Sequence, residues 1–374
     1  MTQSQVEALA ESHQSEEIEQ IDESGIISVP FDPNTVKITT TPLTVGELID
    51  RIQYDEINLF TEFQRQAGLW DASKQSQLIE SILMRFPLPT FYFDGQDDNK
   101  WQVVDGLQRV STLKSFAVDK SLKLQGLEFL KQFDGKGFDD LPRDLQRRIR
   151  SFPITVYIIE KGTPEEVKYN IFSRINKGGL VLQPQEIRHA LNQGIPADFV
   201  KYLAAVEEFK KATCWSIRSD RMQDRDFVTR FVSFYLIDFH QYKSDLDTFM
   251  HQGMKQIPKD KRMRDIIIGD FIRAMNTSVK IFGEDAFRKR YNAKDNRKPI
   301  NKAIFEIISV SFAKLSEAEC QKLIKKAPIF RKKFIEINND LSFQRSITQG
   351  TGQKDNVERR FSTIQKIIQE TLEA

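Results

Sequence analysis

The segment Lys100–Phe116 constrains the fold most, because it predicts a strand, a glycine turn and a helix in direct succession. Trp101–Val104 favours a short strand, and Asp105-Gly106 interrupts it. From Leu107 to Leu113 the apolar residues recur at helical spacing. The chain therefore turns from a strand into a helix at a glycine.

This order of elements is compatible with an anion-binding site. The first backbone N–H groups of a helix have no partner within the helix, and they lie at the positive end of its dipole. Gln108 and Arg109 lie in this first turn, and a guanidinium can donate two parallel hydrogen bonds to phosphate. On these residues alone, an ordinary turn with a surface arginine explains the pattern equally well.

Length and composition indicate a globular protein of two domains. The chain has 374 residues, of which 40% are hydrophobic and 29% charged. No apolar run approaches the ~20 residues of a membrane span, and the first 25 residues are acidic where a signal peptide is basic. We therefore expect a cytoplasmic protein without membrane contact. Cys214 and Cys320 stand far apart and offer no zinc-site spacing.

Charge is distributed unevenly along the chain. Residues 1–25 hold six Glu and one Asp without Lys or Arg, whereas residues 255–374 hold 26 Lys and Arg against 15 Asp and Glu. The basic end either presents a face to DNA or consists of ordinary solvated helix surfaces. The candidates for DNA contact are Arg288, Lys289, Arg290, Lys332, Lys333, Arg359 and Arg360.

The sequence predicts an α+β protein in three parts. Residues 1–34 are rich in Glu, Gln and Ser without periodicity, which is typical of a disordered acidic tail. Residues 35–162 alternate short strands and helices, including a capping box formed by Thr44 and Glu47. Thr90–Phe93 and Trp101–Val104 are expected to form a hairpin, which places Asp105 at the end of an inner strand. Residues 163–374 are predominantly helical and become basic towards the C-terminus.

Helical periodicity recurs in most of this last part. A cap at Thr163-Pro164 predicts a helix that ends near Gly178. Phe227, Phe231, Phe234 and Phe239 form an aromatic stripe that we interpret as core. The further expected helices are Glu186–Asn192, Ala197–Phe209, Asp226–Phe239, Arg264–Phe282, Lys302–Leu315, Glu317–Lys326 and Val357–Leu372.

Nuclease chemistry is not expected from this chain. An HNH-type site needs clustered histidines that bind a metal ion, but the four histidines, His13, His189, His240 and His251, are scattered. The Glu-x-Lys triplets of the chain fall on expected helices and not on strands. His189 either faces a ligand pocket or is an ordinary helix residue.

Several motifs, in order and with plausible gaps, resemble the N-terminal domain family of GmrSD-type restriction endonucleases. This family belongs to the ParB/sulfiredoxin-like superfamily, and the similarity spans roughly Val36 to Leu191. The motifs are Phe63-Gln64-Arg65 with Trp70, Ser81-Ile82-Leu83, Pro87-Leu88-Pro89, Val104–Arg109 with Thr112-Leu113, Ile171–Gly179, Leu182 and Gln185–Arg188.

The resemblance implies a ParB/sulfiredoxin-like mixed-sheet domain that binds, and in many members hydrolyses, a nucleoside triphosphate with Mg²⁺. In the family an Asp-Gly-Gln-Gln-Arg motif serves the nucleotide. It carries over here as Asp105, Gly106, Gln108 and Arg109, while Leu107 stands where the first Gln is usual. The implied catalytic residues are Asp105, Gln108 and Arg109.

Further nucleotide contacts follow from the same resemblance. Arg109 would pair with phosphate, Gln108 would bind a phosphate oxygen or water, and Asp105 would either hold Mg²⁺ or orient Arg109. Arg65 is either a second cation of the site or part of an internal salt bridge. The remaining candidates are Thr112, Asn176, Lys177 and Gly178.

Two functions from different classes remain open. The first is a nucleotide-binding module of a bacterial anti-phage or restriction-type defence system, with possible triphosphatase activity, which acts on DNA or with a nuclease or other defence protein. The second is a non-enzymatic DNA-binding or protein-interaction module in which the Asp105–Arg109 loop is only structural.

Overall fold

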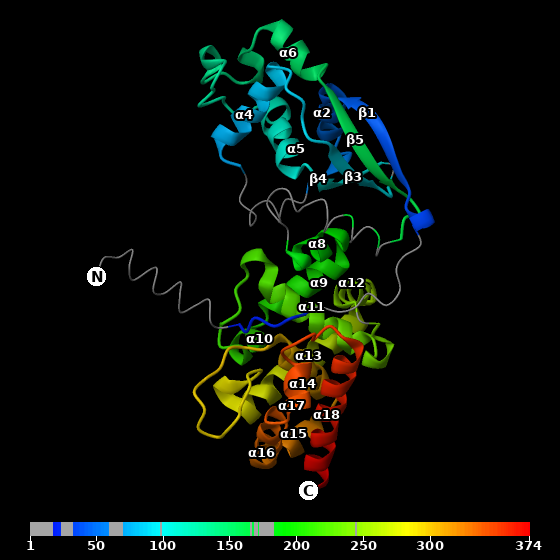
Figure 1. The fold of residues 1–374 in the computed structure, drawn as a ribbon, viewed down its shortest axis with the longest axis vertical. Helices are drawn as coiled ribbons and strands as arrows, with labels where there is room; N and C mark the ends of the chain where they lie inside the picture. Colours follow the sequence, from blue (N-terminus) through cyan, green and yellow to red (C-terminus); the bar gives the residue numbers. More distant parts are fainter. Residues whose placement is uncertain are drawn as a thin grey trace, which may run out of the picture. The chain divides into compact units, whose positions relative to one another are not determined.

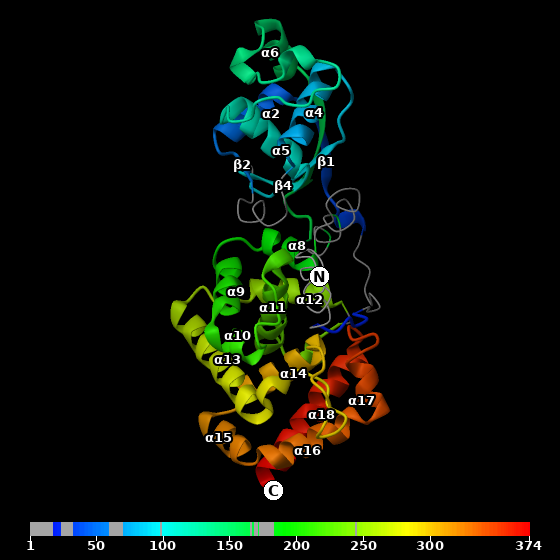
Figure 2. The ribbon, with the colours of Figure 1, turned by 90° about the vertical axis from the view of Figure 1, so that its left-hand side faces the viewer.

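The computed structural model describes residues 18–23, 33–59, 70–97, 99–164, 167, 171, 183–243 and 245–374. The chain divides into two units, one of residues Phe31–Gln183 and one that joins Met1–Pro30 to Pro184–Ala374. Figures 1 and 2 show both units. The sequence predicted the boundary between the two folded domains at residue 162, whereas the two units of the structure meet in sequence between Gln183 and Pro184.

The first unit contains one mixed sheet, in the order β1-β5-β3-β4-β2. Its strands are β1 (Ile38–Thr44), β2 (Ile57–Asn58), β3 (Phe91–Gly95), β4 (Trp101–Asp105) and β5 (Pro153–Glu160). β3 and β4 pair antiparallel as the expected hairpin, while β3 pairs with β5, and β4 with β2, in parallel. β4 is therefore an inner strand, as predicted, and it ends at Asp105.

Helices of this unit pack their apolar side chains against the sheet, and Figure 1 shows α2, α4 and α5 on one side of β1 and β5. The helices are α2 (Val45–Gln53), α4 (Ala72–Leu83), α5 (Leu107–Leu113) with the π-helical turn Lys114–Val118, and α6 (Arg143–Arg150). The capping box is confirmed, because the Thr44 side chain accepts from the Glu47 N–H and Glu47 accepts from the Thr44 N–H. Phe91 and Phe93 project from β3 into the core and are fully buried.

The second unit is helical, so the α+β fold class is confirmed. Its helices are α8 (Pro184–Leu191), α9 (Ile195–Ala205), α10 (Glu207–Ala212), α11 (Gln223–Leu236), α12 (Leu246–Lys255), α13 (Lys261–Phe282), α14 (Lys302–Ala313), α15 (Glu317–Lys325), α16 (Ala327–Asn338), α17 (Leu341–Ser346) and α18 (Lys354–Glu373). Among the described helices, none has the length and apolarity needed to cross a lipid bilayer.

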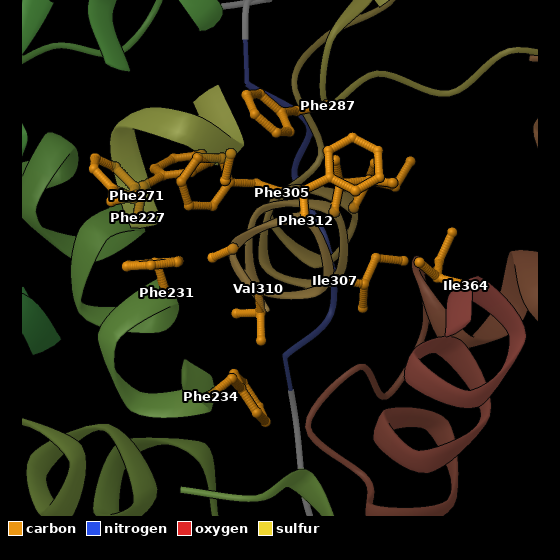
Figure 3. Close-up of a cluster of buried hydrophobic side chains, with 14 of the residues drawn as sticks. Phe227, Phe231, Phe234, Phe271, Phe287, Phe305, Ile307, Val310, Phe312 and Ile364 are labelled. Atoms are coloured by element: carbon orange, nitrogen blue, oxygen red, sulfur yellow. The ribbon is translucent and has the colours of Figure 1, made fainter. Parts of the chain in front are cut away.

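Helix α14 lies at the centre of this unit. Every residue from Ala303 to Ala313 is buried, which is typical of a helix surrounded by others. Figure 3 shows Phe227, Phe231 and Phe234 of α11 in the cluster around it. Phe239 is also buried, so the interpretation of the aromatic stripe as core is confirmed.

Some expected helices differ from those in the structure. The single helix expected for Ala197–Phe209 is two, because Val206 has an extended backbone with ψ of 139°. Helices α12, α16 and α17 were not expected from the periodicity. Most of the helix expected after Thr163-Pro164 lies outside the described residues.

The acidic segment Ile18–Glu23 is part of the helical unit. Ile18 forms a parallel bridge with Ile300, and Lys289 pairs with Glu19. The expectation of a disordered tail over residues 1–34 is therefore corrected for these six residues. Opposite charges and backbone hydrogen bonds supply the contacts that the composition alone did not indicate.

A buried carboxylate anchors the loop that follows the π-helical turn. Glu80 on α4 accepts hydrogen bonds from the N–H groups of Glu128, Phe129 and Leu130, at 3.0, 2.8 and 2.7 Å. Burial raises the pKa of Glu80, but these three donors lower it more, so that its pKa lies below the usual value. The ionised carboxylate thus stabilises the folded state above the pKa of the unfolded chain, and this stability is lost as the pH falls through the folded pKa.

We expect Glu80→Gln to reduce the free energy of unfolding by about 2–3 kcal/mol at pH 7, because the amide loses charge-assisted hydrogen bonds. Urea unfolding at several pH values measures this difference. It should shrink as the pH falls through the lowered pKa of Glu80, where the carboxylate of the parent protein takes up a proton. Glu128→Gln, an exposed change in the same loop, is the control. A difference that does not vary with pH would contradict the assignment.

Candidate functional site

The sequence-predicted site lies where β4 ends and β3 begins. Tyr92 of β3 is paired with Asp105 of β4, and Gly106 then begins α5. The expected succession of strand, glycine turn and helix is therefore confirmed. The turn lies at one end of the sheet, next to the residues that lead into β3.

Gly106 is required here for two reasons. Its φ of 95° lies in the left-handed region that side chains disfavour, and a Cβ at this position would approach Phe91 Cδ1 to 2.7 Å. Phe91 is fully buried and cannot move aside easily. Gly106 therefore allows the backbone to pack closely against the ring of Phe91. The sequence instead predicted that this glycine lets the backbone approach a ligand.

The guanidinium of Arg109 is held by the protein itself. Its Nη2 donates to Asp105 Oδ2 at 2.9 Å and to the carbonyl of Thr90 at 3.2 Å, and its Nη1 donates to the carbonyl of Pro89. The guanidinium carbon also lies 4.4 Å from the centre of the Phe91 ring. Arg109 is only 7% exposed. Its expected role as an open phosphate-binding cation is therefore corrected, and the alternative role of Asp105 in orienting Arg109 matches the geometry.

The electrostatics of this pair are those of a buried ion pair. Burial lowers the pKa of Arg109, and the carboxylate of Asp105 offsets part of that effect. The Asp105 side chain retains 31% exposure. One end of the pair is therefore enclosed, while the carboxylate still reaches solvent.

Gln108 and Thr112 also make local contacts. Gln108 Oε1 accepts from the N–H of Trp70 at 3.0 Å, which ties the chain before α4 to the turn. Thr112 Oγ1 donates to the carbonyl of Gln108 at 2.8 Å and is fully buried. A buried hydroxyl bonded within its own helix is not positioned for a phosphate, so the ligand role of Thr112 is corrected.

Some groups at this end of the sheet remain suited to a ligand. Gly106 provides no side-chain cap for the first N–H groups of α5. Tyr92 and Tyr157 stack with ring centres 5.1 Å apart beside Asp105. Burial, and then the neighbouring Tyr157 and Asp105, raise the pKa of Tyr92. Neither tyrosine was expected from the sequence, because only the register of β3, β4 and β5 brings them to Asp105.

The fit of a metal ion depends on Asp105. Among the described residues, no group of three or more His, Cys, Asp or Glu side chains could hold a metal ion. Mg²⁺ is commonly held by one or two carboxylates together with substrate phosphates, so a single carboxylate suits only a nucleotide-bound ion. The other nucleotide candidates, Arg65, Asn176, Lys177 and Gly178, lie outside the described residues.

Three of the seven DNA-binding candidates are buried in the helical unit. Arg288 is 2% exposed and bonds to Ser216 Oγ and backbone carbonyls. Lys289 pairs with Glu19, and Arg360 pairs with Glu306 at 1% exposure. Their assignment to an exposed DNA-binding face is therefore corrected, because Arg288 and Arg360 are enclosed by the helical unit and Lys289 is paired with Glu19.

The other four candidates differ in exposure. Arg290 bonds to Asp285 and to the carbonyls of Ala293 and Asp295, and Lys333 bonds to Glu370. Lys332 and Arg359 are exposed. His189 is a core histidine, because it is 5% exposed and its Nε2 lies 3.2 Å from Arg225 Nη1.

The mixed sheet and its inner-strand glycine turn define a small α+β domain of the kind that the resemblance implied. Residues 45–192 match the family model of the GmrSD restriction endonuclease N-terminal domain. The matched residues begin with α2 and extend through α8. Comparison with curated proteins and with solved structures found no match.

We expect Gly106→Ala to be more destabilising than a left-handed backbone alone explains. Gly135 provides the control, because it has a φ of 78° and a Cβ added there would meet nothing within 4 Å. Gly135→Ala should cost about 1–2 kcal/mol from its backbone, and Gly106→Ala a further ~1–3 kcal/mol from overpacking against Phe91. Chemical unfolding measures both, and equal losses would contradict the packing role.

Arg359 and Arg360 are neighbours on α18, but only Arg360 is buried, so the two variants compare a buried charge with a surface charge. We expect Arg360→Ala to reduce the free energy of unfolding by about 3–5 kcal/mol, because it breaks a buried ion pair with Glu306. Arg359→Ala, at an exposed position, should change it by less than about 0.5 kcal/mol. Thermal and urea unfolding measure both variants. A stable Arg360→Ala protein would instead indicate that Arg360 is a surface residue.

Proposed function

We propose that this chain is a restriction-type defence module that binds a nucleoside triphosphate at the turn between β4 and α5. The proposal includes a partner, either DNA or a nuclease or other defence protein. Its first support is the match of residues 45–192 to the GmrSD N-terminal domain family. Its second is the turn itself, which supports binding more directly than hydrolysis, because Gln108 and Arg109 bond to the protein.

The observation that carries the proposal is the match of residues 45–192 to the GmrSD N-terminal domain family. Gly106 has no side chain to accept from the first N–H groups of the helix. The positive end of the helix dipole lies at this turn and would favour the negative charge of a phosphate. Arg109 then acts as a positioning residue, which holds Asp105 and the Pro89–Phe91 segment around the turn.

In this proposal, a Mg²⁺ ion and residues other than Arg109 balance the negative charge of the triphosphate. Asp105 is the partly exposed carboxylate that would hold a nucleotide-bound Mg²⁺. Arg65 precedes Trp70, whose N–H bonds to Gln108, and Lys177 follows in the second family motif. We assign these two cations to the phosphates, with Asn176 and Gly178 as neighbouring contacts.

Isothermal titration calorimetry of the full chain with ATP, GTP and CTP, with and without Mg²⁺, tests the proposal. We expect saturable binding of at least one nucleotide, strengthened by Mg²⁺. Asp105→Asn keeps an oxygen acceptor for Arg109 but loses the charge, so it should remove most of the Mg²⁺ effect. Asp139→Asn, at an exposed carboxylate elsewhere in the unit, is the control.

A second pair of variants tests the proposed cations. Arg65→Ala should weaken nucleotide binding about tenfold or more, because it removes charge-assisted hydrogen bonds to phosphate. Arg147→Ala, at an exposed position on α6, should leave the affinity unchanged. Inorganic phosphate release in the same samples measures hydrolysis.

The enclosure of Arg109 favours one alternative, in which the loop is structural and the chain is a non-enzymatic DNA-binding or protein-interaction module. The motif arginine then serves only to join Asp105 to the chain before β3. A folded protein that binds none of the three nucleotides would support this alternative over nucleotide binding. Binding to duplex DNA that weakens steeply with salt would assign the partner.

A further inference from the structure

The N-terminal segment Ile18–Glu23 lies on the helical unit in the manner of a bound peptide. The N–H of Glu19 donates to the carbonyl of Ile300 at 2.8 Å, and the N–H of Asp22 donates to that of Thr348 at 3.1 Å. In return, the N–H of Thr351 donates to the carbonyl of Asp22 at 2.8 Å. In Figure 3 the segment is the blue trace that passes beside α14.

Its carboxylates meet three cations of the unit. Glu19 pairs with Lys289 and accepts from Asn301 Nδ2 at 3.1 Å. Glu23 lies 2.7 Å from Arg230 Nη2 and 3.4 Å from Lys302 Nζ. Two acidic side chains, four residues apart, therefore neutralise a basic surface that α11, α14 and the chain before α14 form.

Two isoleucines complete the recognition. Ile18 and Ile21 are partly buried and pack against the core of the helical unit. Gln20, between them, is exposed. The segment therefore presents a pattern of Ile-Glu-x-Ile-Asp-Glu, in which the two isoleucines and the two glutamates are partly buried and Asp22 is exposed.

We propose that this surface is a docking site for an extended acidic peptide, and that the chain's own segment occupies it in competition with a partner protein. The site consists of Arg230, Lys289, Asn301 and Lys302 with the backbone of Ile300, Thr348 and Thr351. The partner would carry the same pattern of apolar and acidic side chains. This inference concerns the helical unit and does not depend on nucleotide binding.

When the segment leaves, Arg230 and Lys302 keep other ion pairs within the unit. Arg230 also pairs with Asp226 and with Glu306, which is fully buried, and Lys302 also pairs with Asp226 at 3.1 Å. Burial raises the pKa of Asp226, but Lys302, Arg230 and Arg188 lower it more, to well below its usual range, so this carboxylate stays ionised. By contrast, Glu19 and Glu23 keep 23% and 33% of their side-chain surface exposed.

The contacts favour a peptide over a nucleic acid. A phosphodiester backbone would satisfy the cations, but it has no N–H groups to donate to the carbonyls of Ile300 and Thr348. It also has no aliphatic side chain to replace Ile18 and Ile21 against the core. Backbone pairing combined with alternate side-chain contacts is the general mode by which an added strand is recognised.

A competition experiment with the full chain tests the proposal. The probe is a fluorescein-labelled synthetic peptide with the sequence of residues 16–25, followed by fluorescence anisotropy. In the double variant Glu19→Lys with Glu23→Lys, Arg230, Lys289 and Lys302 repel the segment and leave the site open. We expect this variant to bind the probe at least tenfold more tightly than the parent protein, in which the tethered segment competes.

Matched controls isolate the site. The variant Glu7→Lys with Glu11→Lys makes the same charge change outside the segment and should bind the probe as weakly as the parent. A probe with Gln at both Glu19 and Glu23 should bind the open variant at least tenfold more weakly. Equal affinity of the open variant and the parent, or of the two probes, would overturn the proposal. Displacement of the probe by duplex DNA at equal concentration would overturn it in favour of a nucleic acid.

Hydrogen exchange of the unaltered protein tests the proposal even if the double variant does not fold. The N–H groups of Glu19 and Asp22 should be protected, because both donate to backbone carbonyls. Unlabelled peptide at millimolar concentration, comparable to that of a tethered segment, should reduce their protection, and the Gln peptide should not. Protection that the acidic peptide leaves unchanged would show that the segment is a fixed part of the fold.

Discussion

The ion pair between Arg109 and Asp105 is the contact on which the candidate site of the first unit depends. A buried guanidinium must satisfy its donors within the protein, because an unpaired buried charge is costly. Arg109 meets this requirement with one carboxylate and the carbonyls of Pro89 and Thr90. The end of β4, the start of β3 and the first turn of α5 are thereby joined, and Gly106 allows them to approach closely enough.

The same physical requirement governs the helical unit. Arg230 and Arg360 share the fully buried Glu306, and Arg360 also bonds to the carbonyls of Ser346 and Thr351. Part of the basic excess of residues 255–374 thus takes part in internal pairing and is not surface charge. The acidic segment Ile18–Glu23 completes this balance from the opposite end of the chain, so the two oppositely charged regions of the sequence meet in one unit.

These contacts change how the family motif is interpreted. Residues 45–192 match a family model named for restriction endonucleases, and Arg109 of the motif is here a support for the turn. At this turn the carboxylate of Asp105 is partly exposed, whereas the guanidinium of Arg109 is buried. The register of β3, β4 and β5 adds Tyr92 and Tyr157 to that surface.

Local features were predictable from the sequence, because they depend on residues close together in the chain. The Thr44–Glu47 capping box, the glycine turn at Gly106 and the β3–β4 hairpin all follow from short patterns, and the structure confirms them. The aromatic stripe of Phe227, Phe231, Phe234 and Phe239 was also correctly assigned to the core.

Only the tertiary structure decided which charges are buried. Arg109, Arg288 and Arg360 have the same side chain as an exposed arginine, and their partners lie on other segments that no local pattern identifies. Whether a charged side chain is buried depends on the segments that pack around it in the folded protein. A buried charge that is paired internally stabilises the fold, whereas an exposed charge can contact a ligand.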